Sequence, residues 1–376
     1  MRIIIAPDSF KESMTAAQAA QAIARGVRAA AGRDVAIDLC PVADGGEGTV
    51  DALVAATHGK THTTRVMGPL GDWVSACWGT LGESSDAVIE MAQAAGLHLV
   101  PLAYRDPTRT TTCGVGQLIA FALEAGARRI ILGIGGSATN DGGAGMAQAL
   151  GVGFLVAGST PCAAPLTGAD LSRIESIDLG SRDCRLAGTE ILVACDVTNP
   201  LYGPEGAAYT YAPQKGATPE QVELLDRGLR HLASLLPQVD PLAPGMGAAG
   251  GLGFGLVAFC GARLVRGIEL VMEAVRFEER LRGCDLVITG EGRLDGQSIR
   301  GKTCIGIAQA AARHGVPTVA MVGSAGPGAE LALQAGLAGY HCIVDGRGAV
   351  TIEQAVARGP DLLEKLTAKT IARHLT

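Results

Sequence analysis

Short apolar runs, glycine-rich polar loops and alanine-rich stretches alternate along most of this chain. The first apolar run, RIIIA, precedes the loop PDSFKES and a predicted helix from about Thr15, where Thr15 and Gln18 have the spacing of a capping box. Five more runs repeat the pattern: VAIDLCPV before ADGGEGT, IILGI before GGSATNDGG, ILVAC before DVTNPLYGPEG, DLVIT before GEGRLDGQS, and PTVAMVG before SAGPG. Continuously apolar strands that alternate with helices predict an α/β fold with a parallel sheet covered on both faces.

The loops indicate where a ligand would bind. In open parallel sheets, ligands bind beyond the carboxyl ends of the strands, where loops of this kind gather. Five of the six loops carry an acidic side chain, and Gly-Gly or Gly-x-Gly recurs among them. A single loop of this kind is ordinarily only a turn, so the prediction of a site rests on the repetition.

Composition narrows the class of protein. A length of 376 residues favours two domains over one large α/β domain. The net charge of -6, with Lys and Arg scattered, provides no basic surface and argues against nucleic acid as a partner. The ten cysteines form no C-x-x-C pair and no cluster at zinc spacing, which is typical of buried thiols in a reducing cytosol.

The sequence also predicts a soluble, cytoplasmic protein without a membrane span. Its start, MRIIIAPDSFKES, has an apolar run too short for a signal peptide. Residues 241–262 carry no charge over about the length that spans a bilayer, but they include two prolines and seven glycines. That composition predicts a glycine-rich turn leading into a short buried helix.

Two loops fit nucleotide-binding patterns incompletely. GIGGSA, residues 133–138, fits G-x-G-x-x-A after a strand, but no acidic residue lies between Asp141 and Asp170 to bind a ribose, so a dehydrogenase is disfavoured. GQSIRGKT, residues 296–303, fits the P-loop pattern, although GEGRLD separates it from the apolar run DLVIT. We interpret it as a phosphate-facing loop of another kind, in which Lys302 is either a phosphate contact or a surface lysine at a helix start.

The loop after IILGI contains no Lys or Arg, so an anion there must be held by backbone N–H groups and hydroxyls. Gly135, Gly136, Gly142 and Gly143 permit close approach of a ligand to the backbone. A helix expected from about Ala144 adds the partial positive charge of its N-terminus.

Three acidic or amide residues near these strands are further candidates. Asn140 and Asp141 could orient a polar substrate, or they could simply cap the following helix. Asp196 comes directly after ILVAC, where a carboxylate can either form a turn or accept a proton from a substrate hydroxyl, and we prefer the second role.

Several of these strings occur together, and in this order, in one known family. APDSFKES, DGGEGT, GIGGSATNDGGAGM, ACDVTNPLYGPEGA with PQKGA, and TGEGRLDGQSIRGKT resemble the signature segments of the bacterial type I glycerate kinases. The resemblance implies a phosphotransferase that moves the γ-phosphoryl group of ATP to D-glycerate with Mg²⁺ and gives 2-phosphoglycerate. Three alternatives stay open: 3-phosphoglycerate as product, a kinase for another small hydroxy acid, and a small-anion binding protein that is not an enzyme.

The resemblance also implies a domain arrangement. One α/β domain, a discontinuous flavodoxin- or Rossmann-like parallel sheet, is expected to comprise residues 1–72 plus 270–376. The other is an inserted α/β domain of residues 73–269, and the active site is expected in the cleft between the two. A homo-oligomer is left open.

Roles for individual residues follow from the same resemblance. Asp196 is the expected base, and Lys11 is expected to contact phosphate or the glycerate carboxylate, with Lys215 as a weaker candidate for such a contact. Asp295 or Glu291 is expected to hold Mg²⁺, since this cation prefers carboxylate oxygens. The remaining expected contacts with substrate or phosphate are Ser9, Gly135, Gly136, Ser137, Thr139, Asn140, Asp141, Gly142, Asn199 and Lys302.

Overall fold

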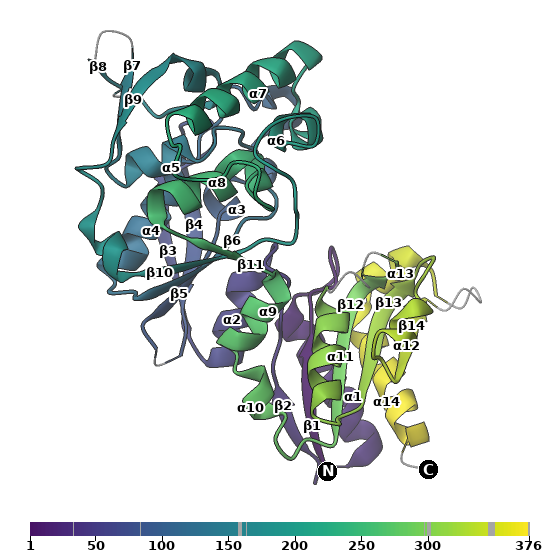
Figure 1. The fold of residues 1–376 in the computed structure, drawn as a ribbon. Coiled ribbons are helices and arrows are strands. Elements are labelled where there is room, and N and C mark those ends of the chain that lie inside the picture. The colour runs from purple at the N-terminus through teal and green to yellow at the C-terminus, as the bar shows by residue number, and fades with distance from the viewer. Residues whose placement is uncertain are drawn as a thin grey trace. The chain divides into compact units, whose positions relative to one another are not determined.

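The structure is a computed structural model that describes residues 1–32, 34–82, 84–156, 160–162, 164–296, 298, 302–344 and 350–374. Its contacts divide the chain into two compact units (Figure 1). Unit 1 comprises Met1–Asp44, Asp51–Gly59 and Gly267–Thr376, and unit 2 comprises Gly45–Val50 and Lys60–Arg266. The chain passes from one unit to the other at 59/60 and again at 266/267. The predicted domain boundaries at 72/73 and 269/270 stay a prediction.

Unit 1 is built on a five-stranded parallel sheet in the order β14-β13-β12-β1-β2. Its strands are β1 (Arg2–Pro7), β2 (Ala36–Leu39), β12 (Leu286–Leu294), β13 (Thr318–Ala325) and β14 (Gly339–Val344). Counted within the unit, this is the flavodoxin-like order 2-1-3-4-5. The strand order reverses between β1 and β12, and in such sheets the ligand binds beyond the carboxyl ends of the strands at that point.

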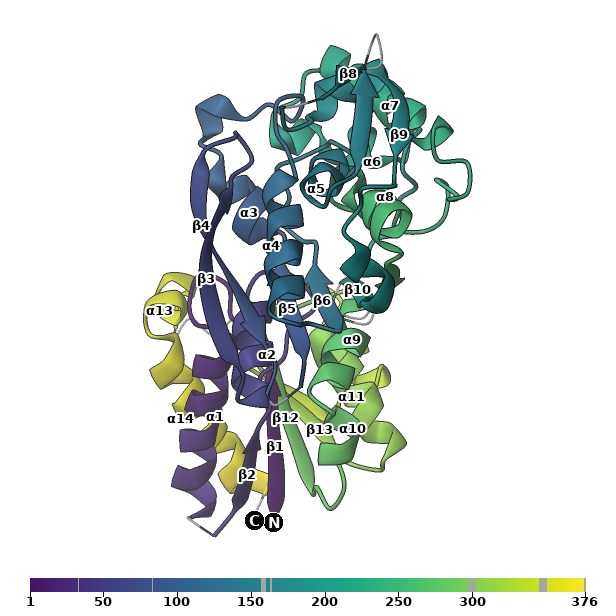
Figure 2. The same ribbon diagram turned by 90° about the vertical axis from the view of Figure 1, so that its left-hand side faces the viewer.

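Helices cover both faces of this sheet (Figure 2). The helices of unit 1 are α1 (Ala16–Ala31), α2 (Thr49–Thr57), α9 (Gly267–Ala274), α10 (Phe277–Arg280), α11 (Thr303–Arg313), α12 (Leu331–Gln334), α13 (Ile352–Ala357) and α14 (Gly359–His374). α1 and α14 pack with Val319 and Met321 of β13, whereas α11 and α12 pack with Ala320 and Val322. Alternate residues of one continuously apolar strand therefore enter different layers, as expected for a parallel sheet covered on both faces.

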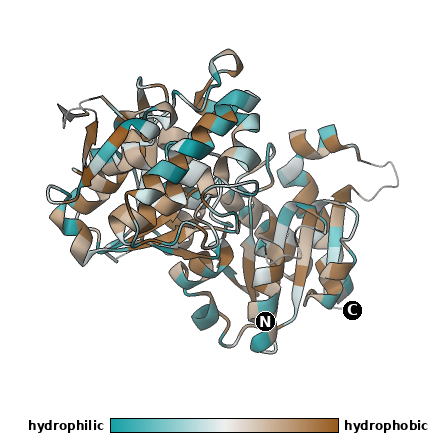
Figure 3. Cartoon of the chain, turned by 45° about the horizontal axis from the view of Figure 1, so that its top comes forward, coloured by the Kyte–Doolittle hydropathy of each residue, from teal (hydrophilic) through white to brown (hydrophobic). Residues whose placement is uncertain are grey.

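Unit 2 contains a six-stranded sheet in the order β11-β10-β6-β5-β4-β3 and a small antiparallel sheet in the order β8-β7-β9. The strands are β3 (Lys60–Met67), β4 (Trp73–Thr80), β5 (Asp86–Glu90), β6 (Arg129–Gly133), β7 (Gly153–Val156), β8 (Thr160–Pro161), β9 (Ile174–Asp178), β10 (Glu190–Ala194) and β11 (Arg263–Val265). The strands from β11 to β5 run parallel, and β4 and β3 add an antiparallel hairpin at one edge. Figure 3 shows hydrophobic residues gathered along the strands and hydrophilic residues mainly on helices and loops.

The helices of unit 2 include one that a hydropathy scan would mistake for a membrane segment. The α-helices are α3 (Ala92–Ala95), α4 (Cys113–Glu124), α5 (Ala144–Ala149), α6 (Ala207–Tyr211), α7 (Pro219–Ser234) and α8 (Ala248–Cys260), and the 3-10 helices are η1 (Leu97–Leu99), η2 (Leu102–Tyr104), η3 (Gly168–Arg173), η4 (Cys184–Gly188) and η5 (Pro213–Lys215). The uncharged stretch 241–262 forms a turn and the buried helix α8, as predicted. None of the helices in the described residues combines the length and apolar character needed to cross a bilayer.

The predicted pattern of elements is largely confirmed. All six apolar runs contain strands, and Thr15 caps α1 through a capping box with Gln18. β12 differs from the prediction because it stays paired with β13 as far as Leu294, so the segment GEGRL lies in the strand. The objection that GEGRLD separates the P-loop pattern from its strand is therefore wrong, since only Asp295 lies between the end of β12 and Gly296.

Candidate functional site

The loop that follows β6 in unit 2 has an outer and an inner half. Gly135 and Gly136 are exposed, and neither amide donates a hydrogen bond to any described residue. Ser137, at 9% exposure, lies at the edge of the surface. The predicted contact residues that come next in the loop, Thr139, Asn140, Asp141 and Gly142, are buried. Only the outer half therefore presents groups to a ligand directly.

Asp141 holds the loop in place. Its buried carboxylate accepts hydrogen bonds from the N–H of Thr112 (2.8 Å), the Thr112 hydroxyl (2.7 Å), and the N–H groups of Gly143 (3.2 Å) and Gly145 (3.3 Å). Burial raises the pKa of Asp141, and these hydrogen bonds act in the opposite direction. Of the two roles considered for Asp141, helix capping is the one that its contacts support.

Lys215 lies beneath the same loop. Its side chain is only 2% exposed, and its Nζ donates to the hydroxyl oxygen of Ser137 (2.6 Å) and to the carbonyl of Thr139 (2.7 Å). Burial lowers the pKa of Lys215 to about 7, and the carboxylate of Asp141 opposes this shift. Because Ser137 accepts a hydrogen bond from Lys215, its own O–H is strengthened as a donor to a ligand.

The remaining polar groups of the inner half are incompletely paired. The hydroxyl of Thr139 and both polar atoms of the Asn140 side chain are buried and have no hydrogen-bond partner within the described part of the chain. Gly250, with a φ of +69°, lies so close to this half that a Cβ would stand 1.9 Å from the carbonyl oxygen of Thr139. Gly142 donates its N–H to the carbonyl of Gly250 (3.1 Å), so its amide is not available to a ligand.

The DGGEGT loop also packs against the loop after β6. A Cβ on Gly133 would stand 2.4 Å from the carbonyl oxygen of Gly45, so the two backbones touch. The N–H of Val50 donates to the buried carboxylate of Glu90 at the end of β5 (2.8 Å). These contacts explain why Gly45–Val50 belongs to unit 2 although the neighbouring segments belong to unit 1.

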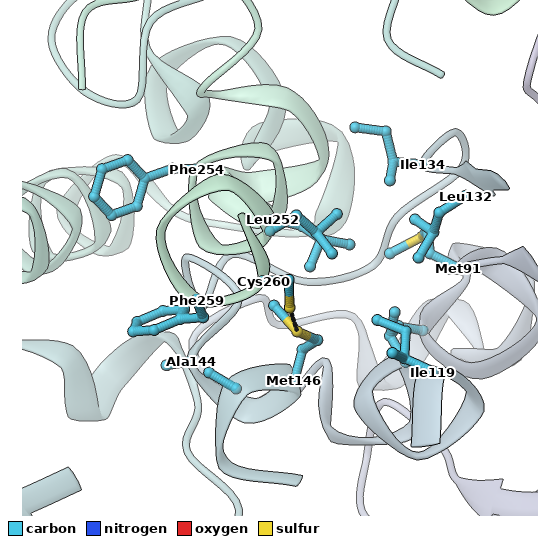
Figure 4. Packing of buried hydrophobic residues seen from close by; sticks show 14 of the residues in the cluster. Met91, Ile119, Leu132, Ile134, Ala144, Met146, Leu252, Phe254, Phe259 and Cys260 are labelled. Atoms are coloured by element: carbon cyan, nitrogen blue, oxygen red, sulfur yellow. Dashed lines mark hydrogen bonds between the residues drawn. The ribbon is translucent and has the colours of Figure 1, made fainter. Parts of the chain in front are cut away.

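A hydrophobic core supports the loop from below (Figure 4). Met146 of α5, Cys260 of α8 and Ile119 of α4 converge there, and the thiol of Cys260 contacts the sulfur of Met146 at 3.7 Å. Burial raises the pKa of Cys260 to about 12, which keeps the thiol protonated. α5 is thus packed against two neighbouring helices, and the loop that precedes it is fixed at its carboxyl end.

The segment after β10 carries two of the predicted residues. Asp196 is exposed two residues beyond the end of β10. Asn199 is engaged within its own loop: its amide donates to the carbonyl of Glu205 (2.7 Å) and to the hydroxyl of Thr210 (3.3 Å), and its carbonyl oxygen accepts from the hydroxyl of Tyr211 (2.6 Å). These bonds indicate that Asn199 shapes the loop.

In unit 1, polar groups gather at the carboxyl ends of β1 and β12. Asp8 follows β1 directly, and its carboxylate accepts from the hydroxyl of Thr303 (2.5 Å) and from the N–H of Ser9 (2.6 Å). Burial, and next the nearby carboxylate of Asp44, raise the pKa of Asp8 to about 6. This group lies at the switch point of the flavodoxin-like sheet, where a ligand is expected.

Glu291, the other acid at this switch point, lies in β12 itself. Its carboxylate faces Ser298, Cys304 and Lys302, and its Oε1 is buried without a hydrogen-bond partner among the described residues. Burial raises the pKa of Glu291 to about 7, with a further contribution from Asp8.

The other residues predicted for this region lie at its edge. Asp295 forms an ion pair with Arg293 (3.3 Å). Lys302 is exposed at the N-cap of α11, next to Thr303, and Lys11 is exposed in the loop after β1. Residues 297 and 299–301 of the P-loop-like string lie outside the described residues.

Sequence reasoning missed Asp8 and Thr303 as members of the site. Asp8 follows the apolar run RIIIA after a single proline, and Asp196 follows the run ILVAC. The signal that singled out Asp196 would therefore also have found Asp8. No sequence signal pairs Asp8 with Thr303, because their contact depends on β1 lying beside β12.

Comparisons with known proteins agree with the resemblance noted in the sequence. Residues 3–376 match the sequence profile described as the glycerate kinase family. A glycerate kinase of Bacillus subtilis (strain 168) is 49% identical, over 100% of this chain and 98% of that protein. A glycerate 2-kinase of Escherichia coli (strain K12) is 50% identical, over 86% of this chain and 85% of that protein. A crystal structure from Salmonella typhimurium LT2, under the provisional name glycerate kinase 2, superposes with a TM-score of 0.90 at 46% identity, covering 100% of this chain and 98% of that one.

The buried Lys215 predicts a pH dependence of stability that Lys215→Met should remove. Between about pH 7 and its ordinary pKa near 10.5, folded Lys215 binds fewer protons than the unfolded chain does, so its burial becomes less unfavourable as the pH rises. We expect the free energy of unfolding of the unmodified protein, relative to Lys215→Met, to increase by on the order of 2 kcal/mol from pH 7 to pH 9. Urea unfolding at both pH values measures it.

The matched control is Lys60→Met, which removes an exposed lysine from the same unit. Its difference from the unmodified protein should stay nearly constant over the same pH range. A constant difference for Lys215→Met as well would contradict the burial of an ammonium under the loop.

Proposed function

The chain belongs to the glycerate kinase family, whose chemistry is phosphoryl transfer from ATP to an alcohol, and we propose that it phosphorylates D-glycerate at the 2-hydroxyl to give 2-phosphoglycerate and ADP. The name of the Escherichia coli relative, glycerate 2-kinase, supports position 2 as the point of transfer. The observation that carries the proposal is the loop Gly135–Gly136–Ser137, with two exposed amides that donate no hydrogen bond to a described residue and a hydroxyl held by Lys215, in a chain that matches this family over nearly its whole length.

We assign the carboxylate of glycerate to the outer half of the loop after β6. A carboxylate is bound well by exposed backbone N–H groups and by a hydroxyl that is already polarised. Gly135 and Gly136 offer the amides, and Ser137 offers the hydroxyl that Lys215 holds in place. Lys215 thus acts through Ser137, which its burial beneath the loop requires.

We assign the phosphates of ATP to the switch point of unit 1. Lys302 at the N-cap of α11 and Lys11 after β1 are exposed cations near this point, and the helix N-terminus adds its partial positive charge. With β12 continuing to Leu294, the string from Gly296 to Thr303 connects a strand to a helix, which is the context that the P-loop pattern needs.

The residues at this switch point fit a divalent cation. Burial raises the pKa of Asp8 to about 6, with a contribution from Asp44, and the pKa of Glu291 to about 7, with a contribution from Asp8. Glu291 Oε1 is a buried acceptor without a partner in the described residues. No group of three or more His, Cys, Asp or Glu residues in the described ranges is arranged to hold a metal alone. Mg²⁺ commonly needs only one or two carboxylates because phosphates and water complete its shell.

We therefore propose that Asp8, Thr303 and Glu291 hold Mg²⁺. The hydroxyl of Thr303 donates a hydrogen bond to Asp8, so the two side chains are already adjacent. In P-loop enzymes, a Ser or Thr of the loop and an Asp of a strand hold Mg²⁺ together. Asp295, which is paired with Arg293, is a weaker candidate than Asp8. When bound, Mg²⁺ would neutralise charge on the phosphates during transfer.

Asp196 is the proposed general base. As the substrate hydroxyl oxygen attacks the γ-phosphorus, the carboxylate accepts the hydroxyl proton and ADP departs with the electrons of the broken P–O bond. Lys11 and Lys302 stabilise the charge on the moving phosphoryl group. The transition state of this reaction is loose, so positioning and charge neutralisation by these residues account for most of the catalysis.

The direct test is ³¹P NMR of the purified protein with ATP, Mg²⁺ and D-glycerate, with L-glycerate, glycolate and no acceptor as controls. We expect a 2-phosphoglycerate resonance and ADP with D-glycerate. A 3-phosphoglycerate resonance would retain the kinase and overturn position 2, and preferential turnover of another acid would change the substrate. ATP that survives in every sample of folded protein would contradict the kinase and favour a binding protein.

In Asp196→Asn, the side chain keeps its shape and loses its negative charge. We expect kcat to fall by about 10²–10⁴-fold with little change in melting temperature, because the hydroxyl then lacks its proton acceptor. Asp240→Asn alters another exposed aspartate of unit 2 and should leave kcat unchanged. An Asp196→Asn variant that turns over at the original rate would remove Asp196 from the mechanism.

Thr303→Val removes the hydroxyl that bonds to Asp8 and keeps the volume of the side chain. We expect Mn²⁺, used as a spectroscopic substitute for Mg²⁺, to bind the protein–ADP complex about 10-fold more weakly, as measured by electron paramagnetic resonance. Thr303→Ser retains the hydroxyl and should bind Mn²⁺ nearly as the unmodified protein does. Equal Mn²⁺ affinities for Thr303→Val and Thr303→Ser would rule out the proposed ligand set.

A further inference from the structure

A pocket that is partly open to solvent lies in unit 1 beside the switch point. It is at the carboxyl ends of β12, β13 and β14, and residues of the loop after β1 and of α13 complete it. Most of its lining is apolar, including Phe10, Ile343 and Ile352, and Lys11 also lines it. Among its lining residues, Lys11 alone has been given a role above.

Bare backbone forms one wall of the pocket. Gly292 of β12 and Gly323 of β13 lie side by side, and a Cβ on Gly323 would stand 2.4 Å from the carbonyl oxygen of Gly292. A Cβ on Gly292 would in turn stand 3.5 Å from the Cα of Phe10. The absence of side chains here leaves a flat surface, which suits a planar ring more than a branched or globular group.

Helix α13 forms another wall of the pocket; it is hydrogen-bonded to the loop after β1 and exposes an apolar side chain to solvent. The hydroxyl of Ser13 donates to the carbonyl of Val356 in α13 (2.9 Å), which ties this helix to the loop after β1. Gly359 permits that contact, because a Cβ there would stand 2.1 Å from the Ser13 hydroxyl oxygen. Ile352 lines the pocket from α13 and is 68% exposed, so a ligand in the pocket would cover it.

The pocket and the proposed phosphate site share one loop. Asp8, at the start of the loop, bonds to Thr303, and Lys11, three residues later, lines the pocket. The apolar slot, the loop that carries Lys11, and the carboxylates of Asp8 and Glu291 all lie along the carboxyl edge of a single sheet. A nucleotide presents a matching set of groups: an aromatic base, phosphates, and the metal that the phosphates carry.

We infer that this pocket binds the purine base of ATP, with the base against Gly292 and Gly323 and under Ile352, and with Lys11 at the phosphates. This assignment rests on the proposed function for the identity of the nucleotide. Two contacts were considered for Lys11, phosphate and the glycerate carboxylate, and this assignment selects phosphate. It also places all the groups assigned to the nucleotide within unit 1.

The test separates the base from the phosphates by using three probes. ADP and inorganic tripolyphosphate are titrated calorimetrically, and adenosine, which has no phosphate, is followed by saturation-transfer NMR. In Ile352→Ala we expect ADP to bind about 5-fold more weakly and the adenosine signal to decrease, while tripolyphosphate binds as before. In Lys11→Met we expect weaker binding of both ADP and tripolyphosphate, with the adenosine signal retained.

Leu333→Ala is the matched control, because it removes an exposed leucine from α12 of the same unit, outside the pocket, and should change none of the three measurements. Unchanged ADP and adenosine binding in a folded Ile352→Ala protein would overturn the base pocket, even if D-glycerate is phosphorylated. The expected pattern of binding without phosphorylation of D-glycerate would support the pocket and refute the proposed function.

Discussion

Two buried groups of opposite charge determine the shape of the loop after β6. Asp141 joins that loop to the starts of α4 and α5 through four hydrogen bonds, and Lys215 supports Ser137 and Thr139 from beneath. Burial of charged groups is unfavourable unless their hydrogen bonds are nearly complete, so neither group can lose its partners cheaply. The loop is consequently fixed before any ligand arrives, with Gly135 and Gly136 facing outward.

This arrangement explains how the loop that we propose to bind an anion can lack basic residues. A lysine within the loop would place a mobile, hydrated charge at the surface, whereas Lys215 lies beneath it with both identified hydrogen bonds directed to loop oxygens. In the proposed site, Lys215 would act on the bound anion through the hydroxyl of Ser137 and through its electrostatic field. The pKa of Lys215 is lowered because burial disfavours its charged form, and the nearby carboxylate of Asp141 partly offsets this effect.

The sequence was sufficient to predict individual strands and a helix start, but it did not reveal which residues contact one another in the fold. The apolar runs predicted the six strands, and Thr15 with Gln18 predicted the start of α1, because both signals depend on neighbouring residues alone. The hairpin of β3 and β4 was not predicted, since half-exposed edge strands lack a continuous apolar run. Among the candidate residues, Asp141 and Asn199 are polar groups in the expected loops, but their bonds support the loops themselves, a distinction that burial reveals and composition does not.

The switch point of unit 1 shows why strand order matters more here than any motif. Asp8 and Thr303 are separated by 295 positions, and they meet because β1 lies between β2 and β12 in a flavodoxin-like order. The P-loop-like string acquires the right context only because β12 remains paired with β13 as far as Leu294, which local propensity does not indicate for a segment with two glycines. Gly323 is needed in β13 for a different reason, since it lets the backbone of β12 approach closely: a Cβ there would stand 2.4 Å from the carbonyl oxygen of Gly292. Gly292 weakens the strand signal in the sequence and also lines the proposed base pocket, so one residue both obscures the end of β12 in the sequence and leaves part of that pocket without a side chain.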